Sequence, residues 1–186
     1  MKKMMFLATT AILSLSMGCN KVKNIANINV DIPYSAQVTV PQINGDTVGV
    51  PIPGTALSFP AVGVATNSKL YLAQYYTDSS KIISFGLKSL SIQVSMPANQ
   101  NFDFLDTIQL YISTVSQPEV LVAYQYNIPK GTNSLDFVTV NNVNLKNYFL
   151  ADTMYFRARA YINAVPASGT QLNIASVFHM VANPLY

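Results

Sequence analysis

Few side chains in this sequence are suited to catalysis. His179 is the only histidine and Cys19 is the only cysteine. A Ser-His-Asp mechanism would have to use His179, yet the chain has no Gly-x-Ser-x-Gly elbow. A single histidine and a single thiol also argue against a transition-metal site. We therefore expect a surface or interface histidine, no catalytic or metal site, and no cofactor.

The acidic side chains suggest turns more than a site. Asn99, Asn101, Asp103 and Asp106 offer oxygen ligands for Ca²⁺, but the glycine and the distal glutamate of an EF-hand loop are missing. Asn and Asp commonly form tight turns and caps. Glycosidase-type carboxylate pairs (Asp103 with Asp106, or Asp136 with Asp152) would need a set separation that the sequence does not give. We expect that the protein is not an enzyme.

The N-terminal residues have the pattern of an export signal. Lys2 and Lys3 form a positive segment, residues 6–15 are mostly apolar, and the small residue Gly18 directly precedes Cys19. The apolar run is shorter than the ~20 residues that a membrane span needs.

The residues Leu15-Ser16-Met17-Gly18-Cys19 resemble the lipobox of bacterial lipoproteins. This resemblance implies that residues 1–18 are removed as a signal peptide and that Cys19 carries acyl chains such as palmitate. In enterobacterial members an Asp after the cysteine retains the protein at the inner membrane. Asn20 stands there instead, which favours the outer membrane of a Gram-negative cell envelope. An ordinary signal peptide with a chance cysteine remains the alternative.

The composition is that of one weakly charged domain. Charged residues make up 10% of the chain, against ~25% in ordinary soluble domains. No basic run occurs, so nucleic acid is not an expected partner. The predicted organisation is a signal peptide over 1–18, a lipidated N-terminus and tether over 19–27, and a single domain over 28–186.

Apolar residues alternate with polar ones along several segments, which indicates half-buried strands. The first runs from Ile28 to Val40, and Pro33 within it suggests an edge strand or a bulge. The apolar phase changes along residues 81–96, which predicts a bulge near Lys88 and Ser89. Further strands are expected over 57–65, 107–116, 119–128 and 134–140, with a long loop over 41–55 and helical turns over 67–76 and 145–150.

The last two strands show the clearest alternation. Residues 154–164 and 171–180 each place apolar side chains on one face. A three-residue turn, Ala167-Ser168-Gly169, would join them as a hairpin with glycine in the left-handed region. That register places Ile162 across from Ile174, and Arg157 across from His179.

About eight short strands without a long amphipathic helix predict an all-β fold. An antiparallel β-sandwich, immunoglobulin-like or similar, is preferred, because short apolar faces on several strands suit two packed sheets. A closed β-barrel is the alternative.

One strand face suggests a recognition surface. Tyr155, Arg157, Arg159 and Tyr161 share the polar face of residues 154–164, and the two arginines are the only ones in the chain. Arginine and aromatic residues are enriched where proteins bind partners. The simpler interpretation is a solvated sheet face with cation–π packing.

Three functions fit these observations. The first is a non-catalytic, membrane-anchored envelope lipoprotein that contacts an envelope protein as an accessory or assembly subunit. The second is a sandwich that binds glycans or another small ligand, and the third is a carrier of an apolar ligand. In general style the chain resembles small outer-membrane β-sandwich lipoproteins of the Bacteroidota.

Overall fold

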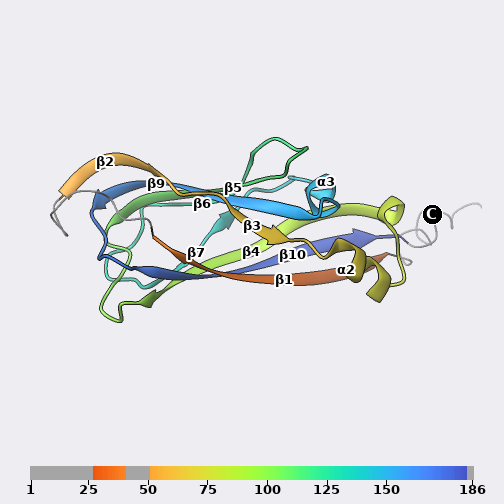
Figure 1. The fold of residues 1–186 in the computed structure, drawn as a ribbon, viewed down its shortest axis with the longest axis horizontal. Coiled ribbons are helices and arrows are strands. Elements are labelled where there is room, and N and C mark those ends of the chain that lie inside the picture. Colours follow the sequence, from red (N-terminus) through yellow and green to blue (C-terminus); the bar gives the residue numbers. More distant parts are fainter. Residues whose placement is uncertain (1–26, 41–50, 184–186) are drawn as a thin grey trace, which may run out of the picture.

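The computed structural model describes residues 27–40 and 51–183, which form two antiparallel sheets (Figure 1). The signal peptide, Cys19 and most of the tether lie outside the described residues. The four-stranded sheet has the order β1-β10-β4-β7, from β1 (Ile28–Thr39), β10 (Gln171–Ala182), β4 (Ile82–Met96) and β7 (Ser134–Asp136). The six-stranded sheet has the order β2-β9-β5-β6-β8, from β2 (Pro51–Ser58), β9 (Thr153–Ala164), β5 (Leu105–Ser113), β6 (Val120–Tyr126) and β8 (Val138–Thr139), with β3 (Val62–Ala65) also paired to β9.

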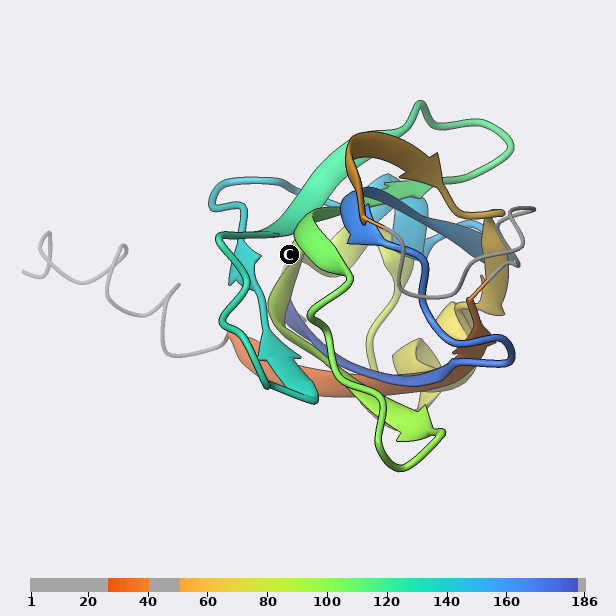
Figure 2. The same ribbon diagram turned by 90° about the vertical axis from the view of Figure 1, so that its left-hand side faces the viewer.

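The two sheets pack face to face as a sandwich (Figure 2). Alternate side chains of each strand point into the space between the sheets, as in β10, where Phe178 and Met180 are fully buried. In the core the Phe85 ring stacks on two others. Its centroid lies 4.3 Å from that of Phe149 and 5.1 Å from that of Phe178. This confirms the predicted all-β sandwich. The closed barrel is wrong, because the described strands pair into two separate sheets.

Two local predictions about strands are confirmed. β1 lies at the edge of the four-stranded sheet, so among the described residues Pro33 has one neighbouring strand, β10. Along β4, Ser89 pairs with Val177 while Leu87 pairs with Phe178, which leaves Lys88 as the extra residue of a bulge.

The predicted hairpin of the last two strands is wrong. β9 pairs with β2, β3 and β5, whereas β10 pairs with β1 and β4. Ile162 therefore pairs with Leu105 rather than Ile174, and Arg157 pairs with Tyr111 rather than His179. Residues 165–170 cross from one sheet to the other, a step of ~10 Å. Gly169 does adopt the expected left-handed conformation, with φ of 75°.

Several predicted segments are divided differently. The expected strand over 57–65 is interrupted at Pro60 and becomes the end of β2 and all of β3, and β2 begins at Pro51 inside the expected loop. The expected strand over 134–140 changes sheets at Phe137, giving β7 and β8. These divisions raise the number of strands in the described residues to ten. Residues 41–50 of the expected loop lie outside the described residues.

The short helices cover one end of the sandwich. α2 (Ser68–Gln74) inserts Leu72 into the core, and η1 (Ser79–Lys81) leads into β4. Asn67 is the N-cap of α2, and its side chain makes no capping hydrogen bond. α3 (Lys146–Phe149) is the helical turn predicted over 145–150.

Tyr76, in the turn that follows α2, has an unusual backbone conformation. Its φ is 50°, and the N–H groups of Tyr76 and Thr77 donate to the carbonyl oxygens of Ala73 and Leu72. This is the hydrogen-bond pattern of a Schellman motif, in which glycine is usual because a side chain is strained there. The Tyr76 side chain is 94% exposed, so buried packing does not compensate for that strain.

Candidate functional site: the outer face of the six-stranded sheet

The four predicted recognition residues lie on the outer face of β9. Tyr155, Arg157, Arg159 and Tyr161 alternate with the inward Met154, Ala160 and Ile162, which are buried. Tyr161 is half exposed, and each arginine side chain is a little under half exposed. Gly63 on β3 pairs with Tyr155. A Cβ at Gly63 would lie 3.3 Å from the Tyr155 ring, so the glycine leaves space for that ring.

Glu119 holds both arginines in place. Its carboxylate forms an ion pair with Arg159 and lies 3.5 Å from Nε of Arg157. The Arg159 guanidinium also lies over the Tyr111 ring, 4.3 Å from its centroid. One carboxylate thus fixes two cations on a sheet surface and leaves one positive charge uncompensated within this group.

The loop between β5 and β6 positions Glu119. Thr114 Oγ1 accepts hydrogen bonds from the N–H groups of Ser116 and Gln117, at 3.2 and 2.9 Å. The Tyr148 hydroxyl donates to the carbonyl oxygen of Pro118 at 2.8 Å. Glu119 is therefore placed by a loop that is bonded within itself and to α3.

Further tyrosines extend this face over β5 and β6. Tyr124 and Tyr126 stack with ring centroids 4.7 Å apart. Gln109 donates to the Tyr126 hydroxyl and accepts from the Tyr111 hydroxyl, each at 3.0 Å. We name the whole set the tyrosine–arginine face: Gln109, Tyr111, Glu119, Tyr124, Tyr126, Tyr155, Arg157, Arg159 and Tyr161.

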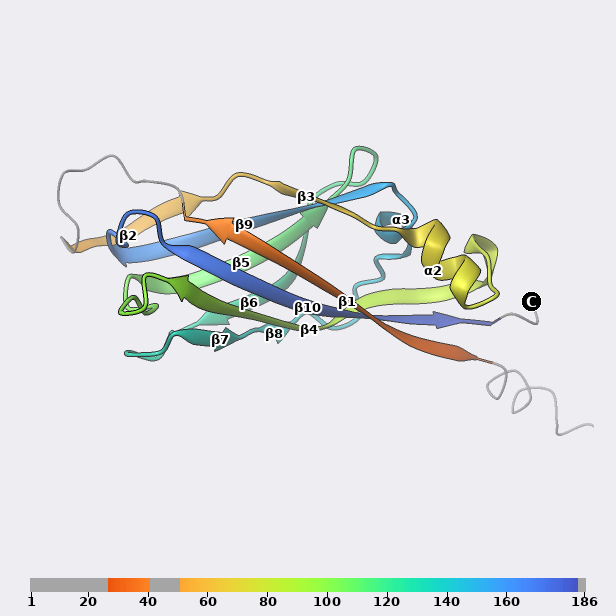
Figure 3. The ribbon, with the colours of Figure 1, turned by 60° about the horizontal axis from the view of Figure 1, so that its bottom comes forward.

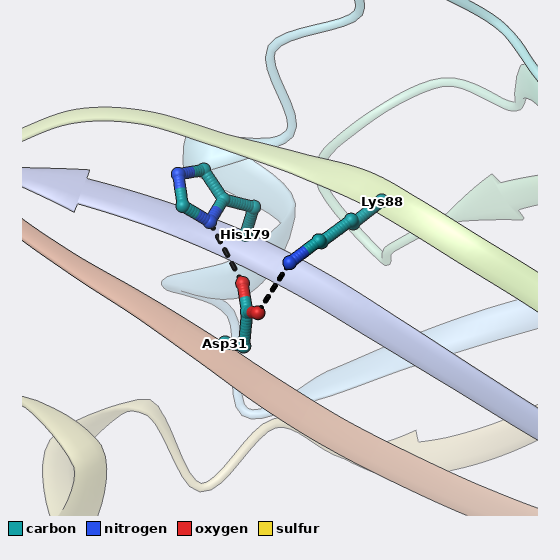
Figure 4. A network of polar contacts seen from close by, with 3 residues as sticks. All are labelled: Asp31, Lys88 and His179. Atoms are coloured by element: carbon teal, nitrogen blue, oxygen red, sulfur yellow. Dashed lines mark hydrogen bonds and ion pairs between the residues drawn. The ribbon is translucent and has the colours of Figure 1, made fainter.

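The opposite outer face, on the four-stranded sheet, carries the histidine. His179 Nδ1 lies 2.8 Å from Asp31 Oδ1, and Lys88 Nζ lies 2.5 Å from Asp31 Oδ2 (Figure 4). The three residues come from the adjacent strands β10, β1 and β4. The bulge at Lys88 thus adds a cation beside Asp31. The hydrogen bond from Lys88, and then that from His179, hold the pKa of the Asp31 carboxyl below its usual value.

This network predicts an acid-dependent contribution to stability. A carboxyl whose pKa is lowered by folding stabilises the native state above its unfolded pKa and loses that effect as the pH falls through the folded pKa. Asp31→Asn should therefore lower the melting temperature at neutral pH, and the difference from wild type should shrink below the reference value of 3.8. Thermal unfolding monitored by circular dichroism, at neutral pH and at a pH below 3.8, measures this difference. Asp136→Asn, at an exposed site on β7 of the same sheet, controls for net charge, and a constant difference for Asp31→Asn would contradict the prediction.

The acidic residues singled out in the sequence are structural or separated. Asp103 Oδ1 accepts from the Gly131 N–H at 2.6 Å, and its other oxygen accepts from Asn101 Nδ2 at 3.0 Å. Asp103 thus joins two loops. Asp136 lies on β7 of the four-stranded sheet, whereas Asp152 lies just before β9 and 4.0 Å from Lys69. Within residues 27–40 and 51–183, no three His, Cys, Asp or Glu residues group as metal ligands.

An apolar cavity of about 70 Å³ lies between the sheets. Its lining includes Tyr34, Ala36 and Val38 from β1, and Val62 and Val64 from β3. These strands lie at the same open side of the sandwich. The Tyr34 hydroxyl donates to the carbonyl oxygen of Thr66 at 2.6 Å, and burial raises the pKa of Tyr34. Among the described residues, no helix has the length and apolar character required to cross a bilayer.

Comparisons with known proteins do not assign a family. No family model matches the chain, and no curated protein matches it. Among solved structures, the chain is similar to one titled Desmodium yellow mottle tymovirus, with 15% identity over 98% of this chain and 96% of that chain. The TM-score of that match is 0.26, which is too low to support an argument about function.

Proposed function

We propose that this protein is a non-catalytic lipoprotein, anchored through Cys19 to the cell envelope, that binds an envelope protein through its tyrosine–arginine face as an accessory or assembly subunit. The observation that carries the proposal is the pairing of both arginines with Glu119, with Arg159 also lying over the Tyr111 ring, on the outer surface of the six-stranded sheet. The Asn20 after the lipobox favours the outer membrane as the site of anchoring.

The fixed geometry of these side chains supports recognition of a protein surface. Tyrosine and arginine are frequent among the residues that dominate binding energy. Arg159 is already held by Glu119 and Tyr111, so less side-chain entropy is lost when a partner binds. The uncompensated positive charge favours a partner with a carboxylate opposite the arginines.

The glycan alternative has weaker support from the same face. Sugars stack on open aromatic ring faces, but Tyr124 and Tyr126 already stack on each other and Arg159 lies over one face of Tyr111. The apolar-carrier alternative would use the cavity between the sheets. Its volume of about 70 Å³ is far below the ~300–1,000 Å³ of typical ligand pockets.

Partner capture from intact membranes tests the proposal. After chemical crosslinking, wild-type protein should recover one envelope protein in stoichiometric amount. Arg157→Ala combined with Arg159→Ala should reduce that recovery by about tenfold or more, as expected for loss of hot-spot residues. The double variant should keep the wild-type circular dichroism spectrum, because both side chains lie on the surface.

Lys88→Ala combined with Lys130→Ala is the matched control, since it removes two cations elsewhere and should leave capture unchanged. Undiminished capture by the double arginine variant would exclude this face as the binding site. A glycan-array signal that depends on the same arginines would instead favour the ligand-binding alternative.

A further inference from the structure

The end of the sandwich that carries α2 has exposed apolar side chains. Leu70 is 66% exposed, Tyr76 is 94% exposed and Ile83 is 50% exposed. They lie on α2, on the turn that follows it, and at the start of β4, which share this end of the molecule (Figures 1 and 3). The Tyr76 side chain extends from a backbone position that favours glycine. A side chain kept at a strained and exposed position suggests a role in binding.

The first described strand begins at this same end. Ile28 opens β1 and pairs with Ala182, the last residue of β10. α2 packs nearby, since Leu72 shares a buried cluster with Val30 and Ile82. The chain therefore enters the sandwich beside the exposed apolar side chains.

The tether places a limit on the distance to an anchor. Ile28 follows Cys19 by nine residues in the sequence, and a chain of that length spans at most ~30 Å when fully extended. If Cys19 carries lipid, this end of the sandwich lies within that distance of the bilayer surface. The opposite end, where β2 lies, is directed away along the length of the strands (Figure 3).

The four charges named at this end balance each other. Lys69, which precedes Leu70 on α2, lies 4.0 Å from Asp152, and Lys81, at the end of η1, acts on the Asp78 carboxyl. Lys21 and Lys23 follow Cys19 closely in the sequence, so they add positive charge beside the proposed anchor, which anionic headgroups attract. Tyrosine is typical of membrane interfaces, because its ring is apolar and its hydroxyl is polar.

We propose that the α2 end of the sandwich lies on the lipid bilayer, with Leu70 and Tyr76 inserted at the boundary between headgroups and acyl chains. This proposal rests on the lipid anchor of the proposed function and adds an orientation to it. The tyrosine–arginine face then runs away from the membrane along the strands, where it is open to a partner protein.

Tryptophan fluorescence tests this orientation directly, because the chain has no tryptophan. Tyr76→Trp and Leu70→Trp introduce single probes into exposed sites that should not disturb folding. Tyr161→Trp is the matched control, since Tyr161 is half exposed on β9 towards the other end. Each full-length variant, processed and purified from membranes, is reconstituted into vesicles of phosphatidylcholine and phosphatidylglycerol with acyl chains brominated near the headgroup.

We expect the emission of Trp probes at positions 70 and 76 to shift to the blue and to be quenched by the brominated lipid. Emission from the probe at position 161 should not change. If all variants co-sediment with the vesicles but positions 70 and 76 are quenched no more than position 161, the orientation is wrong and the anchor stands. If the protein does not co-sediment, the anchor itself is wrong, and the orientation proposal fails with it. Quenching that requires a second copy or another protein would also overturn direct lipid contact.

Discussion

Replacing Cys19 with serine is expected to move almost all of the protein from the membrane fraction to the soluble fraction. A serine hydroxyl cannot receive the acyl chains that the lipobox resemblance implies. Each buried methylene contributes about 0.8 kcal/mol to membrane binding, and one acyl chain alone gives only marginal anchoring. Under the proposed anchoring, several chains on one cysteine would give stable attachment, and their loss should be decisive even if the α2 end touches the bilayer.

Fractionation after a carbonate wash measures this effect. Asn24→Ser, in the predicted tether, is the matched control and should remain in the membrane pellet. A Cys19→Ser protein that still resists the wash would contradict lipid anchoring. Mass spectrometry gives an independent result, because an intact leader or an unmodified thiol at Cys19 would exclude the modification.

Phe178→Ala is expected to destabilise the fold more than any surface change considered above. Phe178 is fully buried, stacks on Phe85 at 5.1 Å, and makes edge contacts with Tyr34 at 5.6 Å and with Phe156 at 6.3 Å. These partners come from β4, β1 and β9, so the ring connects both sheets. Truncation of a buried phenylalanine costs about 3–5 kcal/mol, because the cavity left behind closes only in part.

Such a loss corresponds to a fall of about 10 °C in melting temperature for a domain of this size. Urea unfolding monitored by circular dichroism gives the free energy of unfolding itself. Tyr126→Ala removes an aromatic ring that is 44% exposed and should cost about 1 kcal/mol or less. Equal losses for the two variants would show that Phe178 is not at the centre of the core.

The inward and outward faces of the strands could be predicted from the sequence, but the order of the strands could not, and the one pairing that was predicted is wrong. A period of two assigns Ile162 and Ile174 to the core, and both are in or against one buried cluster. That assignment is the same whether β9 and β10 are neighbours in one sheet or lie in opposite sheets. Side-chain alternation therefore does not distinguish the two arrangements. The left-handed Gly169 does not distinguish them either, because it also occurs in the observed connection between sheets. The bulge at Lys88 was predictable because it changes the phase within a single strand.

The candidate site was predicted only where it lies on one strand. The outward set on β9 follows from alternation, as seen for Arg157 and Arg159. Glu119 and Tyr111 were missed, because their contribution depends on which strands lie next to β9. The pairs Gln109 with Tyr111 and Tyr124 with Tyr126 show the same polar and aromatic alternation, a signal that becomes interpretable once the order β9-β5-β6 is known.

The edge position of Pro33 affects how strands of neighbouring copies could pair. A lipid-tethered protein diffuses in two dimensions, so its copies meet often, and unpaired strand edges invite stacking into aggregates. Pro33 removes one backbone donor from β1, while the other edge of that sheet is the three-residue β7. The last strand of the six-stranded sheet, β8, has only two residues. These three strands are therefore poor templates for intermolecular pairing, which under the proposed anchoring favours a dispersed layer of separate copies.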